Sequence, residues 1–77
     1  MKNKTTKNQN QKVIFSDGID SLCEKKPDFK KEIENYIQKN FNIKDSQIIE
    51  CDSFFTEEPY YIQKVDGIIY VYFWAEH

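Results

Sequence analysis

The sequence predicts an α+β fold in which one or two N-terminal helices pack on one face of a three-stranded antiparallel β-meander. Hydrophobic residues recur at helical spacing in the first half of the chain, and from residue 47 onward the pattern changes to the two-residue period of strands. An Asp66-Gly67 pair, typical of a tight hairpin turn, separates the last two apolar runs. The 77 residues allow one modest core, and aromatic residues, 16% of the chain, supply much of its area.

Residues 1–12 are predicted to form a disordered, lysine-rich tail, and residues 13–77 a single small domain. The tail has four lysines, no acid and no apolar residue between Met1 and Lys12, so it cannot bury enough surface to offset its ordering entropy. No apolar segment follows it, as a secretory signal requires, and no apolar run approaches the roughly 18 residues that span a bilayer. We therefore expect a cytoplasmic protein that makes no membrane contact.

The first helix is expected to begin after Ser16 and to end near Lys25. Ser16 suits the N-cap position, and Asp17 places an anion in the first turn, where the helix dipole favours it. Apolar residues follow at helical spacing, at Ile19, Leu22 and Cys23. The preceding apolar triplet, residues 13–15, is either a short extra strand or the anchor of this helix.

The second helix is expected to begin at Pro27, which fits the first helical position because no amide donor is needed there. One apolar stripe runs along this helix, made of Phe29, Ile33, Tyr36, Ile37 and Phe41. Asn40 and Asn42 are candidates for the left-handed residue that ends many helices. A helix with a single apolar stripe can cover one face of a sheet.

Three strands are expected, at residues 47–55, 60–65 and 68–75, with residues 56–59 as a connection. The Asp66-Gly67 turn fixes the register of the last two strands, because a two-residue turn places Val65 opposite Ile68. By the same register Tyr61 lies opposite Tyr72.

Side-chain alternation then gives the sheet two different faces. One face is nearly pure hydrocarbon, and we expect the helices to cover it. The predicted core combines this face with the helix stripes and consists of Phe15, Leu22, Phe29, Ile33, Ile37, Phe41, Ile49, Cys51, Phe55, Ile62, Ile69, Val71 and Phe73. The other face carries Tyr61, Tyr70, Tyr72 and Trp74 together with Gln63, Ile48 and Phe54, while Tyr60 belongs to the hydrocarbon face. Too little chain remains to bury this second face.

The second face is the candidate binding site. Several amphipathic rings on an exposed sheet would form a larger apolar patch than scattered surface residues explain, and Tyr and Trp are enriched at interface hot spots. The candidate partner-binding residues are Tyr61, Tyr70, Tyr72, Trp74, Glu50 and Asp52. Two alternatives compete with this hypothesis. The rings could serve only as cross-strand pairs, each worth about 0.2–1 kcal/mol, or the N-terminal segment could cover them.

The charge distribution indicates the kind of partner. From Asp45 onward the chain has seven acidic residues against Lys64 alone, a net charge of −6. Carboxylates beside aromatic rings suit lysine and arginine side chains, through charge pairing and through cation–π contact. The hypothesis is therefore a non-catalytic binding or inhibitory module that binds a basic partner protein, as an immunity, antitoxin or anti-defence protein would.

Two other binding functions stay open. Aromatic rings on a sheet can stack nucleic-acid bases, and the lysine-rich tail could contact phosphates. Against single-stranded nucleic acid, the acids share the sheet with the rings and the chain contains no arginine. The same face could instead join two copies of the chain in a homodimer.

No catalytic residue, cofactor or metal site is predicted. The sequence contains no phosphate-binding loop, dinucleotide glycine pattern or nucleophile elbow. A zinc site needs about four ligands at suitable spacings, whereas Cys23, Cys51 and the terminal His77 lie far apart in the chain. Both cysteines are expected to be reduced and to pack as small hydrophobic residues.

Overall fold

The computed structural model describes residues 12–40 and 42–76, which form an α+β fold as predicted. Its elements are β1 (Val13–Phe15), α1 (Asp17–Lys25), α2 (Pro27–Lys39), β2 (Ile48–Cys51), β3 (Tyr60–Val65), β4 (Ile68–Phe73) and a 3-10 helix, η2 (Trp74–Glu76). Most of the predicted tail, residues 1–11, lies outside the described residues, as do the predicted core residue Phe41 and the terminal His77. In the part of the chain that is described, no helix has the length and apolar character needed to cross a membrane.

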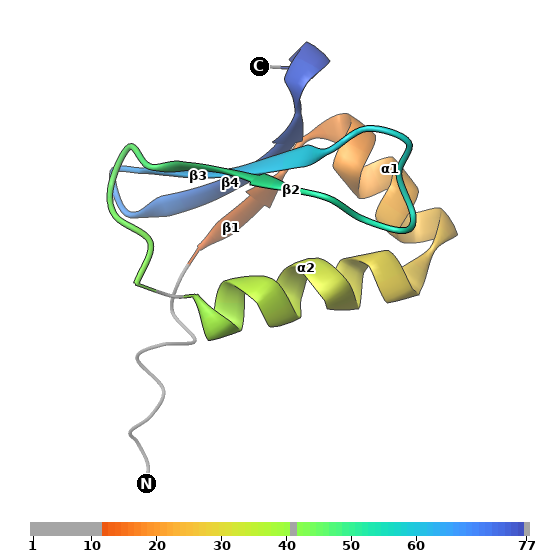
Figure 1. Ribbon diagram of the computed structural model, residues 1–77, viewed down its shortest axis with the longest axis horizontal. Helices are drawn as coiled ribbons and strands as arrows, with labels where there is room; N and C mark the ends of the chain where they lie inside the picture. The colour runs from red at the N-terminus through yellow and green to blue at the C-terminus, as the bar shows by residue number, and fades with distance from the viewer. Residues whose placement is uncertain (1–11, 41, 77) are drawn as a thin grey trace, which may run out of the picture.

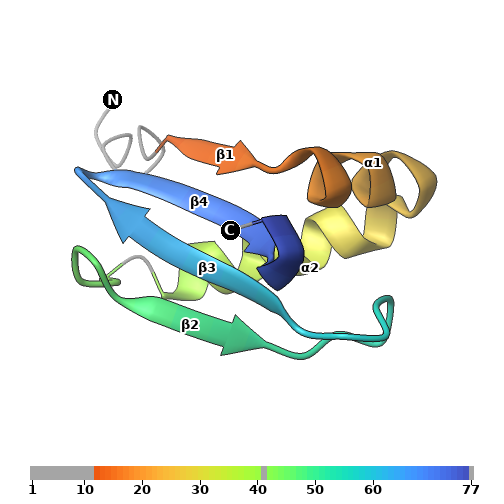
Figure 2. The same cartoon turned by 90° about the horizontal axis from the view of Figure 1, so that it is seen from above.

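The sheet has four strands in the order β1-β4-β3-β2 (Figure 2). The triplet Val13–Phe15 joins it as an edge strand, and this strand runs parallel to β4. Backbone bonds from Ile69 N–H to the Lys12 carbonyl and from Ser16 N–H to the Val71 carbonyl, both 2.9 Å, continue the pairing at either end. The expected three-stranded meander is thus present, with a fourth strand added from the beginning of the domain.

The β3–β4 hairpin has the predicted turn and register. Asp66 and Gly67 both have positive φ, 52° and 82°, as a type I′ turn requires. Val65 lies opposite Ile68, and Tyr61 lies opposite Tyr72. Every side chain of the two strands is therefore on the face that the sequence assigned to it.

The helix ends follow local hydrogen bonding. Ser16 is the N-cap of α1, and its side chain accepts a hydrogen bond from Ile19 N–H at 3.2 Å, while Pro27 begins α2. The prediction that Asn40 takes a left-handed conformation is wrong, because its φ is −123°. Its backbone N–H and its side-chain Nδ2 both donate to the Tyr36 carbonyl, at 3.0 Å and 2.8 Å. That carbonyl is satisfied without a left-handed residue.

The first predicted strand is too long, because β2 ends at Cys51 rather than at Phe55. Ser53 turns the chain away from the sheet. Its hydroxyl accepts a hydrogen bond from Phe55 N–H at 3.1 Å and donates to Glu32 Oε1 at 3.2 Å. A serine side chain that bonds to the backbone two residues later competes with strand pairing.

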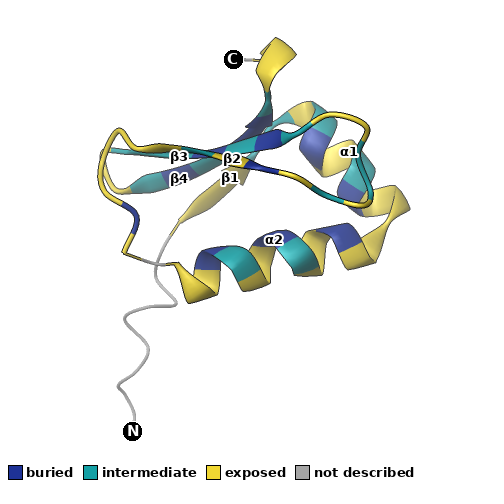
Figure 3. Cartoon of the chain, in the orientation of Figure 1, coloured by how far each residue is buried: buried dark blue, intermediate teal, exposed yellow. Residues whose placement is uncertain are grey.

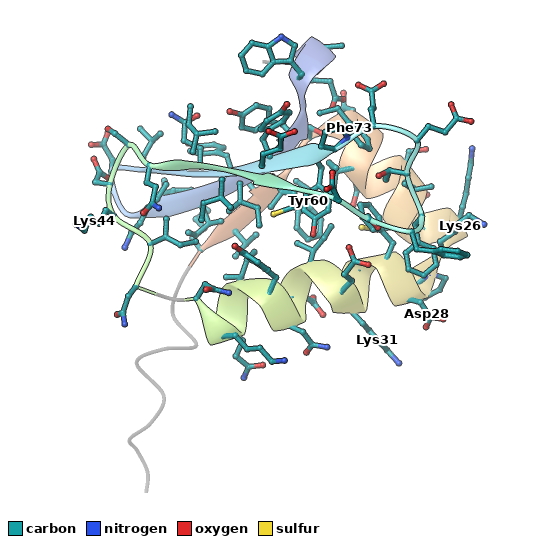
Figure 4. The ribbon with its side chains drawn as sticks, viewed as in Figure 1. Lys26, Asp28, Lys31, Lys44, Tyr60 and Phe73 are labelled. Carbon is teal, nitrogen blue, oxygen red and sulfur yellow. The ribbon has the colours of Figure 1, made fainter. Side chains whose placement is uncertain are left out.

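One hydrophobic core lies between α2 and the sheet (Figure 1), and the buried side of α2 faces the strands (Figure 3). The Phe29 ring is fully buried, with its centroid 5.4 Å from that of Tyr60 and 6.1 Å from that of Phe55. Tyr60 lies between the sheet and α2 in Figure 4. Of the predicted core, Phe29, Ile33, Ile37, Cys51, Ile62, Ile69 and Val71 are buried, while Phe15, Leu22, Ile49, Phe55 and Phe73 are half-buried against them. Ile19, Cys23, Ile43 and Tyr60 complete the core.

Substitution Phe29→Ala is expected to lower the free energy of unfolding by about 3–5 kcal/mol, because it leaves a cavity where the Phe29 ring packs against Tyr60 of β3 and Phe55 of the loop after β2. Urea denaturation followed by circular dichroism measures the change. Lys31→Ala, on the solvent side of the same helix (Figure 4), is the matched control and should change it by less than about 0.5 kcal/mol. A loss below about 1 kcal/mol for Phe29→Ala would show that this interface is not the core.

Candidate functional site: an open aromatic sheet face

The sheet face turned away from α2 is the candidate site, here called the open face (Figure 1). Strand pairing assigns to it Ile14, Ile48, Glu50, Tyr61, Gln63, Val65, Ile68, Tyr70 and Tyr72. Two rows cross the sheet on this face. The first runs Ile14–Tyr70–Gln63–Ile48, and the second runs Tyr72–Tyr61–Glu50. All six sequence-predicted site residues lie on this face or at its margin.

Three of the rings form one cluster. Tyr61 stacks on Tyr72 with centroids 5.9 Å apart and an interplanar angle of 27°. Trp74 packs on Tyr61, with ring centroids 5.4 Å apart and an interplanar angle of 57°. The Tyr72 hydroxyl donates to Gln63 Oε1 at 3.2 Å, which orients its ring. The cluster is therefore a preformed platform rather than a set of independent side chains.

The members of the open face differ in exposure. Trp74 is 58% exposed, and Tyr61 and Tyr70 are half-buried. Tyr72 is only 7% exposed, so the prediction that it is a solvent-facing contact residue is wrong. It is covered although neither α1 nor α2 lies over this face, because the Tyr61 ring stacks on it. Tyr72 supports the platform, and Trp74 is the most exposed ring of the cluster.

Trp74 lies in η2 rather than in the last strand, as β4 ends at Phe73. The cause is a set of hydrogen bonds to the Glu76 carboxylate, which we call the Glu76 clamp. Oε1 accepts from Ser16 Oγ at 2.6 Å and from Phe73 N–H at 3.0 Å, and Oε2 accepts from Gly18 N–H at 2.8 Å. The clamp bends the chain over the sheet (Figure 2) and ties η2 to the N-terminus of α1.

Gly18 gives the Glu76 carboxylate room at the first turn of α1. A Cβ at this position would lie 2.6 Å from Glu76 Oε2, closer than van der Waals contact permits. A side chain at residue 18 would therefore force the carboxylate to shift from the position in which the clamp is formed. In the sequence this glycine weakens the expectation of a helix, and the structure gives the reason for its presence.

Carboxylates surround the exposed end of the ring cluster. Burial raises the pKa of the Tyr61 hydroxyl, and the negative charges of Glu50, Glu58 and Asp52 raise it further. Glu50 lies directly opposite Tyr61 across the β2–β3 pair, and Asp52 follows the end of β2. A negative potential therefore acts on this side of the open face, where a cation is favoured. Glu58 is a member of this acidic margin that strand alternation could not place, because it lies in the β2–β3 loop.

A groove of about 480 Å³ adjoins the acidic margin, between β2 and α2. Its lining residues are Glu32, Asn35, Tyr36, Lys39, Glu50, Cys51, Asp52 and Tyr60. Glu32 is held by two donors, Ser53 Oγ at 3.2 Å and the Tyr60 hydroxyl at 3.3 Å. No sequence signal singled out Glu32, because its role depends on a helix meeting a distant loop.

The Cys51 thiol and the Tyr60 phenol that line the groove have raised pKa values, which disfavours their ionised forms. Burial raises the pKa of the Cys51 thiol more than a hydrogen bond with Tyr60 lowers it, and nearby carboxylates raise it further. Burial, followed by the charges of Cys51 and Glu32, likewise raises the pKa of the Tyr60 hydroxyl, which stays protonated and donates to Glu32. Cys23, on the inner side of α1, is also a free, buried thiol with a raised pKa. In the described part of the chain, no set of three or more His, Cys, Asp or Glu side chains is arranged to hold a metal ion.

The structure places two exposed apolar residues, Ile14 and Phe54, where the sequence did not predict them. Ile14 adds to the open face from β1, since it pairs with Tyr70. Phe54, which alternation placed on the tyrosine side, instead lies in the loop after β2, is 95% exposed and contacts Phe55 at 5.7 Å. Phe54 is therefore an exposed ring away from the stacked cluster.

Comparison of the chain with protein-family models, with curated proteins and with solved structures gave no match.

The Glu76 clamp predicts a pH dependence of stability. Burial by itself raises the pKa of this carboxyl, but the hydrogen bonds from Ser16, Phe73 and Gly18 outweigh it and hold the pKa below its ordinary value of 4.5. A group with a lowered pKa in the folded state stabilises the fold above its unfolded pKa, and this contribution is lost as the pH falls through the folded value.

Glu76→Gln is therefore expected to lower the free energy of unfolding by about 0.3–1 kcal/mol at pH 7, the range for a charge at a helix terminus. The difference from wild type should shrink as the pH falls below about 4.5, and urea denaturation between pH 7 and pH 3 measures it. Glu24→Gln, on the exposed side of α1, is the control. A difference that is independent of pH would show that the clamp carboxylate carries no charge-dependent stabilisation.

Both thiols are expected to react at least tenfold more slowly with a disulfide reagent in the native protein than in urea, since burial raises their pKa and blocks access. Thiol titration at pH 8 with and without denaturant measures the rates. Immediate labelling of both in the native state would place them outside the core.

Proposed function

We propose that the chain is a non-catalytic binding module of the immunity, antitoxin or anti-defence type, and that its open face binds the basic surface of a partner protein. The observation that carries this proposal is a preformed ring cluster, with Trp74 accessible, bordered by carboxylates. A contiguous exposed apolar patch rimmed by polar residues often marks an interaction site. The acidic margin selects a cationic partner over a neutral one.

The open face can bind a lysine or arginine side chain in two ways, through cation–π contact and through pairing with carboxylates. A cation placed over the ring of Trp74 or Tyr61 gains about 0.5–1 kcal/mol at an exposed site and more when desolvated. The carboxylates of Glu50 and Asp52 can pair with the same cation. Because the stacking with Tyr61 already orders Trp74, little side-chain entropy is lost on binding.

The negative net charge of the C-terminal half of the chain also favours a basic partner protein. Seven acids against one lysine from Asp45 onward give this part of the chain a strongly negative field. Such a field steers a basic partner and raises the association rate, an effect that salt screens. The same field repels the phosphates of a nucleic acid, which disfavours a nucleic acid as the partner.

The non-catalytic part of the proposal rests on the sequence and on the thiols. The chain lacks the motifs of common catalytic sites, and the raised pKa of Cys51 keeps this residue from acting as a nucleophile at neutral pH. Two free cysteines fit a reducing compartment, which supports the expected cytoplasmic location.

The proposal is tested by capturing the partner from source cells with wild-type protein and then measuring affinity with the purified partner. Trp74→Ser should weaken binding at least tenfold, or about 1.4 kcal/mol. Phe54→Ser is the matched control, because it removes an even more exposed ring away from the cluster, and it should change affinity less than twofold. Trp74 is preferred to the buried Tyr72, whose loss would also destabilise the fold.

The captured protein should carry a basic surface, and its binding should weaken as salt is raised. Equal affinity for wild type and a folded Trp74→Ser variant would contradict the proposal. So would capture that disappears after nuclease treatment, which would identify a nucleic acid, or sedimentation showing that Trp74 mediates only self-association.

A further inference from the structure

The free edge of β2 has backbone groups that point away from β3. In a two-residue hairpin the closing pair, Val65 and Ile68, exchanges hydrogen bonds, and hydrogen-bonded pairs then alternate along the strands. The backbone N–H and C=O groups of residues 61, 63 and 65 of β3 thus bond to β4. Those of residues 60, 62 and 64 point toward β2, so the direction of the backbone groups alternates between odd and even residues. The 2.6 Å bond from Ser46 N–H to the Lys64 carbonyl agrees with this parity.

The same parity assigns the backbone groups of β2. Ile49 and Cys51 lie opposite Ile62 and Tyr60, so they use their N–H and C=O groups on β3. Ile48 and Glu50 therefore direct theirs to the outer edge of the sheet (Figure 2). Within the described residues these outward groups have no hydrogen-bond partner. An unpaired edge of this kind is a template for another strand.

We propose that a segment of the basic partner binds as a fifth, antiparallel strand beside β2, with its alternate lysine or arginine side chains entering the groove between β2 and α2. This inference rests on the proposed function, since it specifies how the partner of the open face is held. Main-chain bonds to Ile48 and Glu50 would supply affinity, and alternate side chains would supply specificity, as in other cases of strand addition.

Side-chain alternation explains why the groove and the edge act together. Residues of the added strand opposite Ile49 and Cys51 point to the inner side, where the groove lies. Residues opposite Ile48 and Glu50 point to the open face and extend its first row beyond Ile48, which is 46% exposed. The partner strand should therefore alternate basic residues with apolar ones.

The groove has the charge and shape for a long basic side chain. Its carboxylates are Glu32, Glu50 and Asp52, against Lys39 as the cation of the lining. The half-buried Tyr36 supplies apolar surface for the aliphatic stem, with the buried Cys51 and Tyr60 at the base of the groove, while the charged end reaches the carboxylates at the rim. The Glu32 carboxylate is already oriented by hydrogen bonds from Ser53 and Tyr60, so it is positioned to accept a further hydrogen bond from a lysine or arginine side chain. This charge complementarity distinguishes β2 from β1, the other edge of the sheet.

The test uses a nonapeptide of alternating lysine and valine, titrated into the full chain and followed by amide NMR and calorimetry. Binding should slow hydrogen exchange at the Ile48 and Glu50 amides. N-methylation of the valines, which lie opposite these two residues, should weaken binding at least tenfold, because it removes the donors that face β2. N-methylation of the lysines blocks only the far edge of the peptide and should change affinity less than threefold.

The protein side has a matched pair of variants. Ile48→Pro removes the outward N–H without touching the bonds to β3, and it should weaken peptide binding at least tenfold. Ile48→Thr removes the same apolar side chain, keeps the N–H and should retain affinity within threefold. Asp52→Asn should weaken binding and reduce its salt dependence.

The outcomes separate this inference from the proposed function. No binding of the alternating peptide, equal affinity for the two methylated peptides, a stronger loss from lysine methylation, or full binding by Ile48→Pro would overturn the added strand. The proposed function would still stand if Trp74→Ser abolishes capture of a basic partner. Conversely, peptide binding that follows all these expectations while Trp74→Ser leaves partner capture unchanged would retain the edge site and remove the open face as the docking surface.

Discussion

The type I′ turn at Asp66 and Gly67 is the constraint on which the rest of the structure depends. Because it fixes the pairing of β3 with β4, it decides which side chains of both strands meet α2 and which reach solvent. A shift of one residue would place the Tyr61–Tyr72 pair in the core and Ile62 and Val71 in water. The open face is thus a consequence of a two-residue turn.

The contacts that shape the site join parts of the chain far apart in sequence. The Glu76 clamp holds η2 against α1, so the position of Trp74 depends on the first helix of the domain. Glu32 of α2 holds the loop that follows β2 and forms one wall of the groove. The helix layer covers one face of the sheet and also supports the margins of the other. A small core can therefore present an ordered surface.

Local patterns were sufficient to predict much of the fold. Ser16 and Pro27 predicted the helix starts, and two-residue periodicity predicted the two sheet faces, because both signals depend on near neighbours. The parallel pairing of β1 with β4 and the clamp at Glu76 could not be predicted, since they join residues more than 50 positions apart. The burial of Tyr72 was missed because it depends on ring packing within one face rather than on which face it occupies.

The central claim is that cations are favoured on the ring cluster and its acidic margin. It is tested most directly by side-chain and amide NMR of the full chain during titration with tetralysine. The account predicts progressive shifts of the Trp74 indole and the Tyr61 ring, together with Glu50 and Asp52, all reduced by salt. Shifts confined to the solvent side of α2, or unchanged signals from Trp74 and Tyr61 at saturating peptide, would contradict it.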